Sequence, residues 1–325
     1  MRALISVLVV GVLGCGDETG VQPPDAPPDA PPDAPLVDAP PPPIGHQHYV
    51  ISQMRVPANN TEARTYALDV NGDGTVDNQL GMVLATFATM GLPVQAGYSR
   101  AIDQGNSITL VDLFALDLTN DAAATLALFD GTSAMPAPCN GAADLACRHH
   151  LAGTGTFLAA ATPVNAPLAG TITAGTLLAG PGQLSIDLVF DGAMPVAVTL
   201  IGARVKATTF SQAAISTLIL AGAISQTELD TKVIPAMRAG YQSRVAADCT
   251  ALTSPPGCGC APGSAGKTYL DLFEVAPKDC TISIDEVRNN SLIQSLLAPD
   301  VSINGTMALS IGVSTSAVPA GFVAP

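Results

Sequence analysis

The chain has 325 residues, a formal net charge of −14 and only 13 lysines and arginines. Nucleic acids and anionic membrane surfaces are therefore not expected as partners, because both repel an acidic protein. Tryptophan is absent and aromatic residues make up 4% of the chain, so the stacking platforms on which many sugar sites depend would be hard to build.

The N-terminal residues have the pattern of an export signal. One positive charge precedes an uncharged apolar run over residues 3–13, which is too short to span a bilayer and is typical of a secretory signal peptide. The run ends in VLGC, residues 12–15, which resembles the lipobox of bacterial lipoproteins. That resemblance implies a signal peptide over residues 1–14 and a lipid anchor on Cys15. The alternative is an ordinary signal peptide with an unrelated cysteine.

The residue after Cys15 is glycine and not aspartate. In the best-studied sorting rule for lipoproteins, this implies the outer membrane of a Gram-negative bacterium. We therefore expect an extracytoplasmic protein whose contact with the membrane runs through its N-terminal lipid.

A spacer is predicted over residues 15–45. From Pro23 it reads PPDAPPDAPPDAPLVDAPPPP, and proline prevents both helix and sheet because it lacks the N–H group and fixes φ. In polyproline II geometry the 21 residues of this proline-rich stretch would reach about 65 Å at roughly 3.1 Å each. Such a spacer would hold the following domain away from the membrane.

The rest of the chain, 46–325, is expected to form one β-rich domain of the α+β class. The alternative is that its helices over about 226–300 form a C-terminal subdomain. Short alternating or β-branched segments separated by turn residues predict an antiparallel sheet with strands over 48–56, 107–118, 124–130, 170–179, 183–191 and 195–208. Apolar residues at helical spacing predict helices over 78–90, 226–247, 268–274 and 285–297.

The stretch LDVNGDGTVDN, residues 68–78, predicts a calcium site. Oxygen-bearing residues occupy positions 1, 3, 5, 7 and 9 of a calcium loop: Asp69, Asn71, Asp73, Thr75 and Asp77. Position 12 normally carries a bidentate glutamate, but here it is Leu80. The site would therefore borrow a carboxylate from elsewhere, use water or bind weakly. The alternative is a polar turn whose aspartates only cap a helix.

The residues around this loop place it between a strand and a helix. Tyr66, Leu68 and Val70 alternate as in a strand, and helical spacing begins at Leu80. Asp77 or Asn78 would cap the helix. The loop thus resembles the calcium loops of dockerins and related extracellular modules more than a helix-loop-helix EF-hand.

Two later stretches resemble calcium loops but keep fewer carboxylates, and we expect both to be degenerate. The first carries acceptors at positions 5, 7, 9 and 12: Asp279, Thr281, Ser283 and Glu286. The second keeps a single carboxylate: Asp300, Ser302, Asn304, Gly305 and Thr306. The sequence leaves open whether either stretch binds a cation.

Six cysteines remain besides Cys15, an even number in a chain bound for an oxidising compartment, and three disulfides are expected. Cys139 and Cys147 would close a short loop. Cys258 and Cys260 flank one glycine, which is too tight for an easy mutual bond, so they would pair with Cys249 and Cys280 in an order that the sequence leaves open. A zinc site is the alternative, but no C-x₂-C pair or spaced histidine accompanies these cysteines.

Four features together resemble uncharacterised secreted lipoproteins of Gram-negative bacteria. They are the lipobox, the Pro-Asp-Ala linker, the pattern D-x-N-x-D-G-x-x-D-N and the segment DCTISIDEVRNNSLIQSLLAPDV. This resemblance implies no activity.

Catalytic signals are weak. The segment APGSAGKT over 261–268 matches a relaxed Walker A pattern, but it follows two cysteines outside the cytoplasm, so we reject a nucleotide site. His46 and His48 would share one strand face and could hold a transition metal, although exposed histidines at a domain edge are the more common explanation. We therefore expect no enzyme but a protein for adhesion or ligand binding, with an unidentified protein or cell-surface ligand and structural calcium. The alternative is a secreted hydrolase of unrecognised type.

Overall fold

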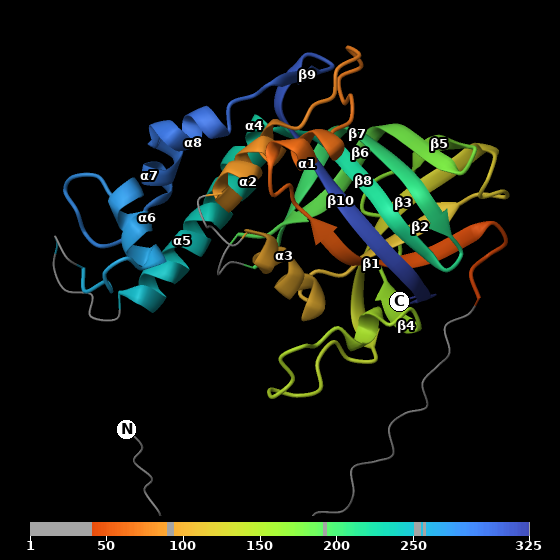
Figure 1. The fold of residues 1–325 in the computed structure, drawn as a ribbon, viewed down its shortest axis with the longest axis horizontal. Coiled ribbons are helices and arrows are strands. Elements are labelled where there is room, and N and C mark those ends of the chain that lie inside the picture. Colours follow the sequence, from red (N-terminus) through yellow and green to blue (C-terminus); the bar gives the residue numbers. More distant parts are fainter. Residues whose placement is uncertain (1–40, 90–93, 191–193, 250–254, 256–257, 325) are drawn as a thin grey trace, which may run out of the picture. The chain divides into compact units, whose positions relative to one another are not determined.

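The computed structural model describes residues 41–89, 94–190, 194–249, 255 and 258–324. Residues Asp38–Pro325 form one compact unit, whose described residues are shown in colour in Figure 1. The signal peptide, Cys15 and most of the spacer predicted over residues 15–45 lie outside the described residues.

In its described residues the compact unit belongs to the α+β class, as predicted, with an antiparallel sheet of ten strands and helices concentrated toward the C-terminus. The strands are β1 (His46–Arg55), β2 (Thr109–Phe114), β3 (Asp121–Met135), β4 (Gly155–Ala159), β5 (Leu168–Thr173), β6 (Thr176–Leu188), β7 (Val196–Ser211), β8 (Ala214–Ser225), β9 (Val301–Ile303) and β10 (Thr306–Val323). The helices are α1 (Asn60–Thr65), α2 (Gln79–Thr89), α3 (Val94–Asp103), α4 (Gln226–Glu228), α5 (Ile234–Asp248), α6 (Ala265–Phe273), α7 (Ile284–Asn289) and α8 (Ser291–Leu296), with a 3-10 turn at His149–Leu151 and a π-helical turn at Leu229–Val233.

The sheet closes on itself. Neighbours pair in the order β1, β2, β3, β5, β6, β7, β8 and β10, and β10 pairs again with β1. All of these pairings are antiparallel, whereas the short β4 pairs antiparallel with β3 and parallel with the end of β10. Closure leaves the main strands without a free edge on which another chain could add a strand.

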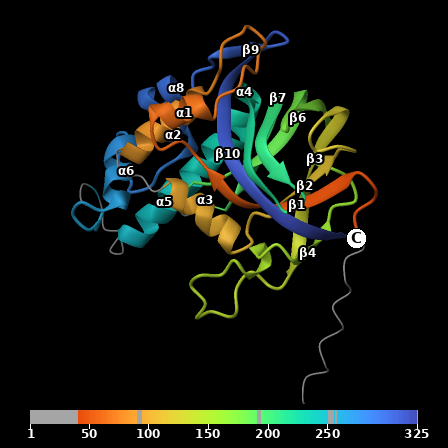
Figure 2. The same ribbon diagram turned by 45° about the vertical axis from the view of Figure 1, so that its right-hand side comes forward.

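The C-terminal strand β10 is the element that closes the sheet. It is 18 residues long and pairs with β1, β4, β8 and β9 along its length (Figures 1 and 2). Leu309, Ile311 and Val313 of this strand are fully buried in the main hydrophobic core. The middle of β10 therefore anchors the helices as well as the sheet.

Helices α5, α6, α7 and α8 gather on one side of the sheet in both ribbon views (Figures 1 and 2). Their buried residues belong to the same hydrophobic core as the strands, so the helices over 226–300 are packed onto the sheet and have no separate core. No helix in the described part of the chain is both long and apolar enough to cross a membrane.

The sequence predicted most of these elements but not all. The helix expected over 285–297 is two helices, α7 and α8, because Asn290 has an extended ψ of 124° and its side chain caps α8 by accepting from the N–H groups of Leu292 and Ile293. The two short helices α1 and α3 and the strands β4, β8, β9 and β10 were not predicted.

Three disulfides join the six cysteines of the compact unit, as predicted. Cys139 bonds with Cys147, and the bonds that the sequence left open are Cys249–Cys260 and Cys258–Cys280. The Cys249–Cys260 bond ties the end of α5 to the segment before α6. The Cys258–Cys280 bond ties that same segment to the loop after α6. Oxidised cysteines in this number fit an extracytoplasmic protein.

Candidate functional site

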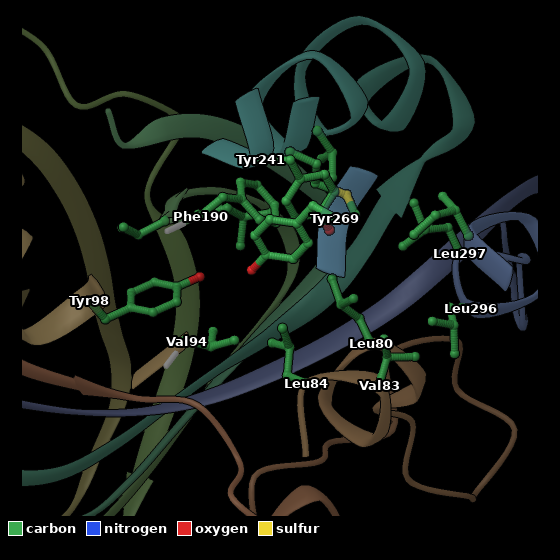
Figure 3. Close-up of a pocket in the computed structure, with 15 residues that line it drawn as sticks. Leu80, Val83, Leu84, Val94, Tyr98, Phe190, Tyr241, Tyr269, Leu296 and Leu297 are labelled. Atoms are coloured by element: carbon green, nitrogen blue, oxygen red, sulfur yellow. The ribbon is translucent and has the colours of Figure 1, made fainter. Parts of the chain in front are cut away.

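An apolar pocket lies where the helices meet one end of the sheet (Figure 3). Its walls come from five helices, the π-helical turn and the end of β6, and its cavity volume is about 50 Å³. The lining residues are Leu80, Val83, Leu84, Val94, Tyr98, Leu188, Val189, Phe190, Val233, Met237, Tyr241, Tyr269, Ile293, Leu296 and Leu297.

Helical spacing explains why these residues converge. On α2, Leu80, Val83 and Leu84 follow the i, i+3, i+4 pattern that places side chains on one face of a helix. On α5, Met237 and Tyr241 are four residues apart and so also share a face. Each helix therefore turns an apolar stripe toward the same space.

Aromatic rings make up one wall of the pocket. The ring centroids of Tyr241 and Tyr269 are 4.6 Å apart, and those of Tyr241 and Phe273 are 4.9 Å apart with the rings nearly parallel. Tyr98 lies across from this group with its hydroxyl toward the middle of the pocket (Figure 3), where it shares a hydrogen bond with the Val189 backbone. Stacked rings of this kind form a stiff, preformed wall.

The pocket lining is apolar apart from the tyrosine hydroxyl groups. Burial raises the pKa of Tyr98 and of Tyr241 above the ordinary tyrosine value, so both phenols stay protonated at neutral pH. Among the described residues that line the pocket, none carries a carboxylate, imidazole, amine, guanidinium, thiol or aliphatic hydroxyl group. The pocket can therefore hold an apolar group but has no general base or nucleophile of ordinary strength.

The sequence did not predict this pocket, because its lining residues come from segments far apart in the chain. Helical periodicity marked Leu80, Val83 and Leu84 as apolar on one face, but it could not show which other helices face them.

The predicted calcium residues lie together in one loop, which the isolated bridge between Leu68 and Asp77 closes just before the start of α2 at Gln79. The Asp69 carboxylate accepts the N–H groups of Gly72, Asp73 and Gly74, at 2.6, 3.2 and 3.0 Å. Gly72 and Gly74 have φ values of 81° and 91°, a conformation that glycine adopts without strain. Asp69 thus holds the turn by three hydrogen bonds.

The remaining residues of the loop also bond to one another. Asp73 accepts the N–H and the hydroxyl of Thr75 at 2.8 and 2.5 Å, which lowers the pKa of its carboxyl group. The amide of Asn71 donates to the other oxygen of Asp73 at 3.0 Å. Asp77 accepts the N–H of Val70 at 3.1 Å.

Negative charge accumulates around Asp77. Burial raises the pKa of its carboxyl group, and the nearby carboxylates of Asp73, Asp300 and Asp69 raise it further. A cation would relieve this repulsion. However, the aspartates of the described loop do not bring one oxygen each to within 4.8 Å of one another, so an ion would have to draw them together. Calcium binding stays a prediction.

A positive charge also lies beside the loop, since a Cβ added at Gly72 would come within 3.8 Å of Nη2 of Arg204. This guanidinium offsets part of the negative charge and would weaken the attraction for a cation.

The two degenerate stretches have structural uses. Glu286 and Ser283 form a capping box at the start of α7, and the other oxygen of Glu286 accepts the N–H of Val275. Asn304 and Gly305 form the tight turn between β9 and β10, with φ values of 51° and 84°. Asp300 accepts the N–H and the hydroxyl of Ser310, at 2.7 and 2.5 Å.

Comparisons of the whole chain with protein-family models, with curated proteins and with solved structures find no match in any of the three. Function must therefore be argued from the residues themselves.

Proposed function

We propose that this chain is a lipid-anchored extracytoplasmic binding protein that takes up a narrow apolar ligand in the pocket between helices and sheet and performs no chemistry on it. The observation that carries the proposal is the pocket wall, in which aliphatic side chains surround three tyrosines and the described lining residues carry no carboxylate, imidazole, amine or thiol. Pockets of this composition bind by burying apolar surface.

The size of the pocket limits the ligand. A volume of about 50 Å³ is several times the ~10–15 Å³ that one water requires by the same measure. A space of this size admits only a few non-hydrogen atoms and excludes fused rings. The methyl end of a single acyl chain fits this description best, with the rest of the chain and its polar end toward the mouth of the pocket.

The rest of the chain supports this assignment. Acylation of Cys15 would hold the protein at a membrane, the natural source of acyl chains, and the proline-rich spacer would let the domain reach about 65 Å from it. Disulfides and bound calcium would stiffen the domain. The glycine after Cys15 favours an outer-membrane location in a Gram-negative bacterium.

A pair of tryptophan variants on α8 tests the proposal. The chain contains no tryptophan, so Leu296→Trp places a single reporter in the pocket wall, while Leu292→Trp places one on the same helix where the side chain is 38% exposed and outside the pocket. Palmitate should shift the emission of the Leu296→Trp variant to shorter wavelength and leave the Leu292→Trp variant unchanged.

Calorimetry on the unsubstituted compact unit, residues 38–325, accompanies these spectra, because the larger indole could itself fill the pocket. One palmitate per chain should bind. If palmitate gives no heat with the unsubstituted protein, or if both tryptophan variants respond alike, the pocket is not a ligand site.

A further inference from the structure

Two histidines and an aspartate converge on neighbouring strands, away from the residues that line the apolar pocket. In the register of β1 and β2, His48 is directly opposite Asp112 and His46 is opposite Phe114. Residues two apart on a strand point to the same face, so His46 and His48 both stand beside the Asp112 carboxylate. Sequence analysis placed the two histidines on one face, but Asp112 could not be assigned to them without the strand register.

The distances within this cluster are short. Nδ1 of His46 lies 2.9 Å from both carboxylate oxygens of Asp112, and Nε2 of His48 lies 3.8 Å from the nearer one. One ligand atom from each of the three residues lies within 4.8 Å of the other two. The side chains of His48 and Asp112 are only 12% and 15% exposed, and that of His46 is 32% exposed.

His48 is held in place but lacks polar partners. Its ring stacks on Phe322 of β10 with centroids 3.9 Å apart and an interplanar angle of 3°. Among the described residues, its buried Nδ1 has no hydrogen-bond partner, and the 3.8 Å between Nε2 and Asp112 is too long for a hydrogen bond. Burying an imidazole without hydrogen-bond partners destabilises the folded state unless another group or an ion binds it.

We propose that His46, His48 and Asp112 form a binding site for a divalent transition-metal ion, for which zinc is the test ion. Zinc bonds of about 2.0–2.1 Å at tetrahedral angles separate neighbouring ligand atoms by about 3.3 Å. The observed separations of 2.9 and 3.8 Å bracket that value, so small side-chain rotations would admit the ion without moving the strands.

The donor set also selects the class of metal. Two imidazole nitrogens and one carboxylate suit zinc and its transition-metal neighbours, whereas calcium and magnesium prefer oxygen ligands throughout. Three protein ligands leave a coordination position open for water or another molecule. The ion would bind Nε2 of His48 and offset the charge of Asp112, while Nδ1 of His48 would carry the ring proton and stay without a partner among the described residues.

The other cluster of metal-ligand residue types in the described part of the chain is already in use. It contains Cys258, Glu274 and Cys280, but the two cysteines form a disulfide and have no thiolate to offer. Glu274 accepts the N–H groups of Asp279 and Cys280. His149 lies outside both clusters, where Nε2 contacts the Asp144 carboxylate at 2.8 Å.

The test is competition for zinc between the full chain and a chromophoric chelator, with excess calcium present to occupy the acidic loop. The unsubstituted protein should bind one zinc. The variants His48→Gln and Asp112→Asn should each bind about tenfold or more weakly, in line with the effect of disturbing metal ligands and their supports. His149→Gln is the matched control and should bind as the unsubstituted protein does.

X-ray absorption of the zinc-loaded unsubstituted protein keeps the proposal testable even if a variant fails to fold. The zinc shell should contain two imidazole nitrogens together with oxygen. A shell of oxygens alone, no zinc uptake by the unsubstituted protein, or an equal loss in His149→Gln would overturn the proposal.

Discussion

Asn78 should be one of the most sensitive positions in the chain, because a single buried side chain there joins three elements. Its side chain donates to the carbonyls of Ala63 in α1 and Gly312 in β10, at 2.8 and 3.0 Å. Its oxygen accepts the N–H groups of Gly81 in α2 and Gly312, at 2.9 and 2.7 Å. The residue is only 3% exposed.

Replacement of Asn78 by alanine would remove all four hydrogen bonds. Each buried backbone group left without a partner costs about 1 to 3 kcal/mol, although water entering the vacated space recovers part of the total. We expect Asn78→Ala to lower the free energy of unfolding by about 3 to 5 kcal/mol, at the high end for a single substitution. Asn106→Ala is the control, since Asn106 is exposed and its loss should cost under about 0.5 kcal/mol.

Urea unfolding followed by circular dichroism measures both values. Asn78→Asp adds a check on the cause, because its carboxylate would face two carbonyls at neutral pH and its folded-state pKa would be raised. The stability lost by this variant should therefore appear as the pH rises above the unfolded-state value near 4 and be partly recovered below it. If Asn78→Ala lowers the free energy of unfolding by less than about 1 kcal/mol, the four hydrogen bonds of Asn78 do not stabilise the fold as expected.

Three further predictions concern the anchor, the disulfides and the loop. Radiolabelled palmitate should enter the unsubstituted protein but not Cys15→Ser, which should also leave the membrane fraction; equal labelling of both would disprove the anchor. Alkylation without reductant should modify none of the six cysteines, and breaking Cys258–Cys280 should cost about 3 kcal/mol for a loop of 22 residues; a reactive Cys258 would contradict this. Calcium should raise the melting temperature of the unsubstituted protein but not that of Asp73→Ala. At ten times a dissociation constant of about 10⁻⁴ to 10⁻³ M, it should add about 1.4 kcal/mol to the free energy of unfolding. If a chelator leaves the melting curve of the unsubstituted protein in place, the loop is only a polar turn.

The spacing of apolar residues predicted the strands and helices whose conformation depends on neighbouring residues in the sequence. Alternating segments such as 107–118 are strands, and the helix after the acidic loop begins where Asn78 caps it, one of the two caps expected from the sequence. Strand β8 was missed because its segment over 218–224 is buried on both faces and so shows no alternation. Strand β10 was missed because Ser, Thr, Ala and Gly dominate it, and long-range pairing with β1 and β8 determines its conformation.

The candidate sites depend even more on tertiary structure. Leu80 and Leu297 lie far apart in the sequence, and only the packing of the segments that carry them brings both to one pocket. Asp112 reaches His46 across 66 positions through the register of two strands. Sequence spacing can mark candidate ligands within one loop, as it does for Asp69 and Asp73, but it cannot do so across separate elements.

We propose that the pocket between helices and sheet holds an acyl chain. The direct test uses a fatty acid that carries a photoreactive diazirine near its methyl end. The protein is irradiated with this fatty acid, and the labelled peptides are mapped by mass spectrometry. The label should fall on peptides of α2, α5 and α8, and excess palmitate should remove it. Label spread over exposed segments, or label on those helices that palmitate does not displace, would contradict the account.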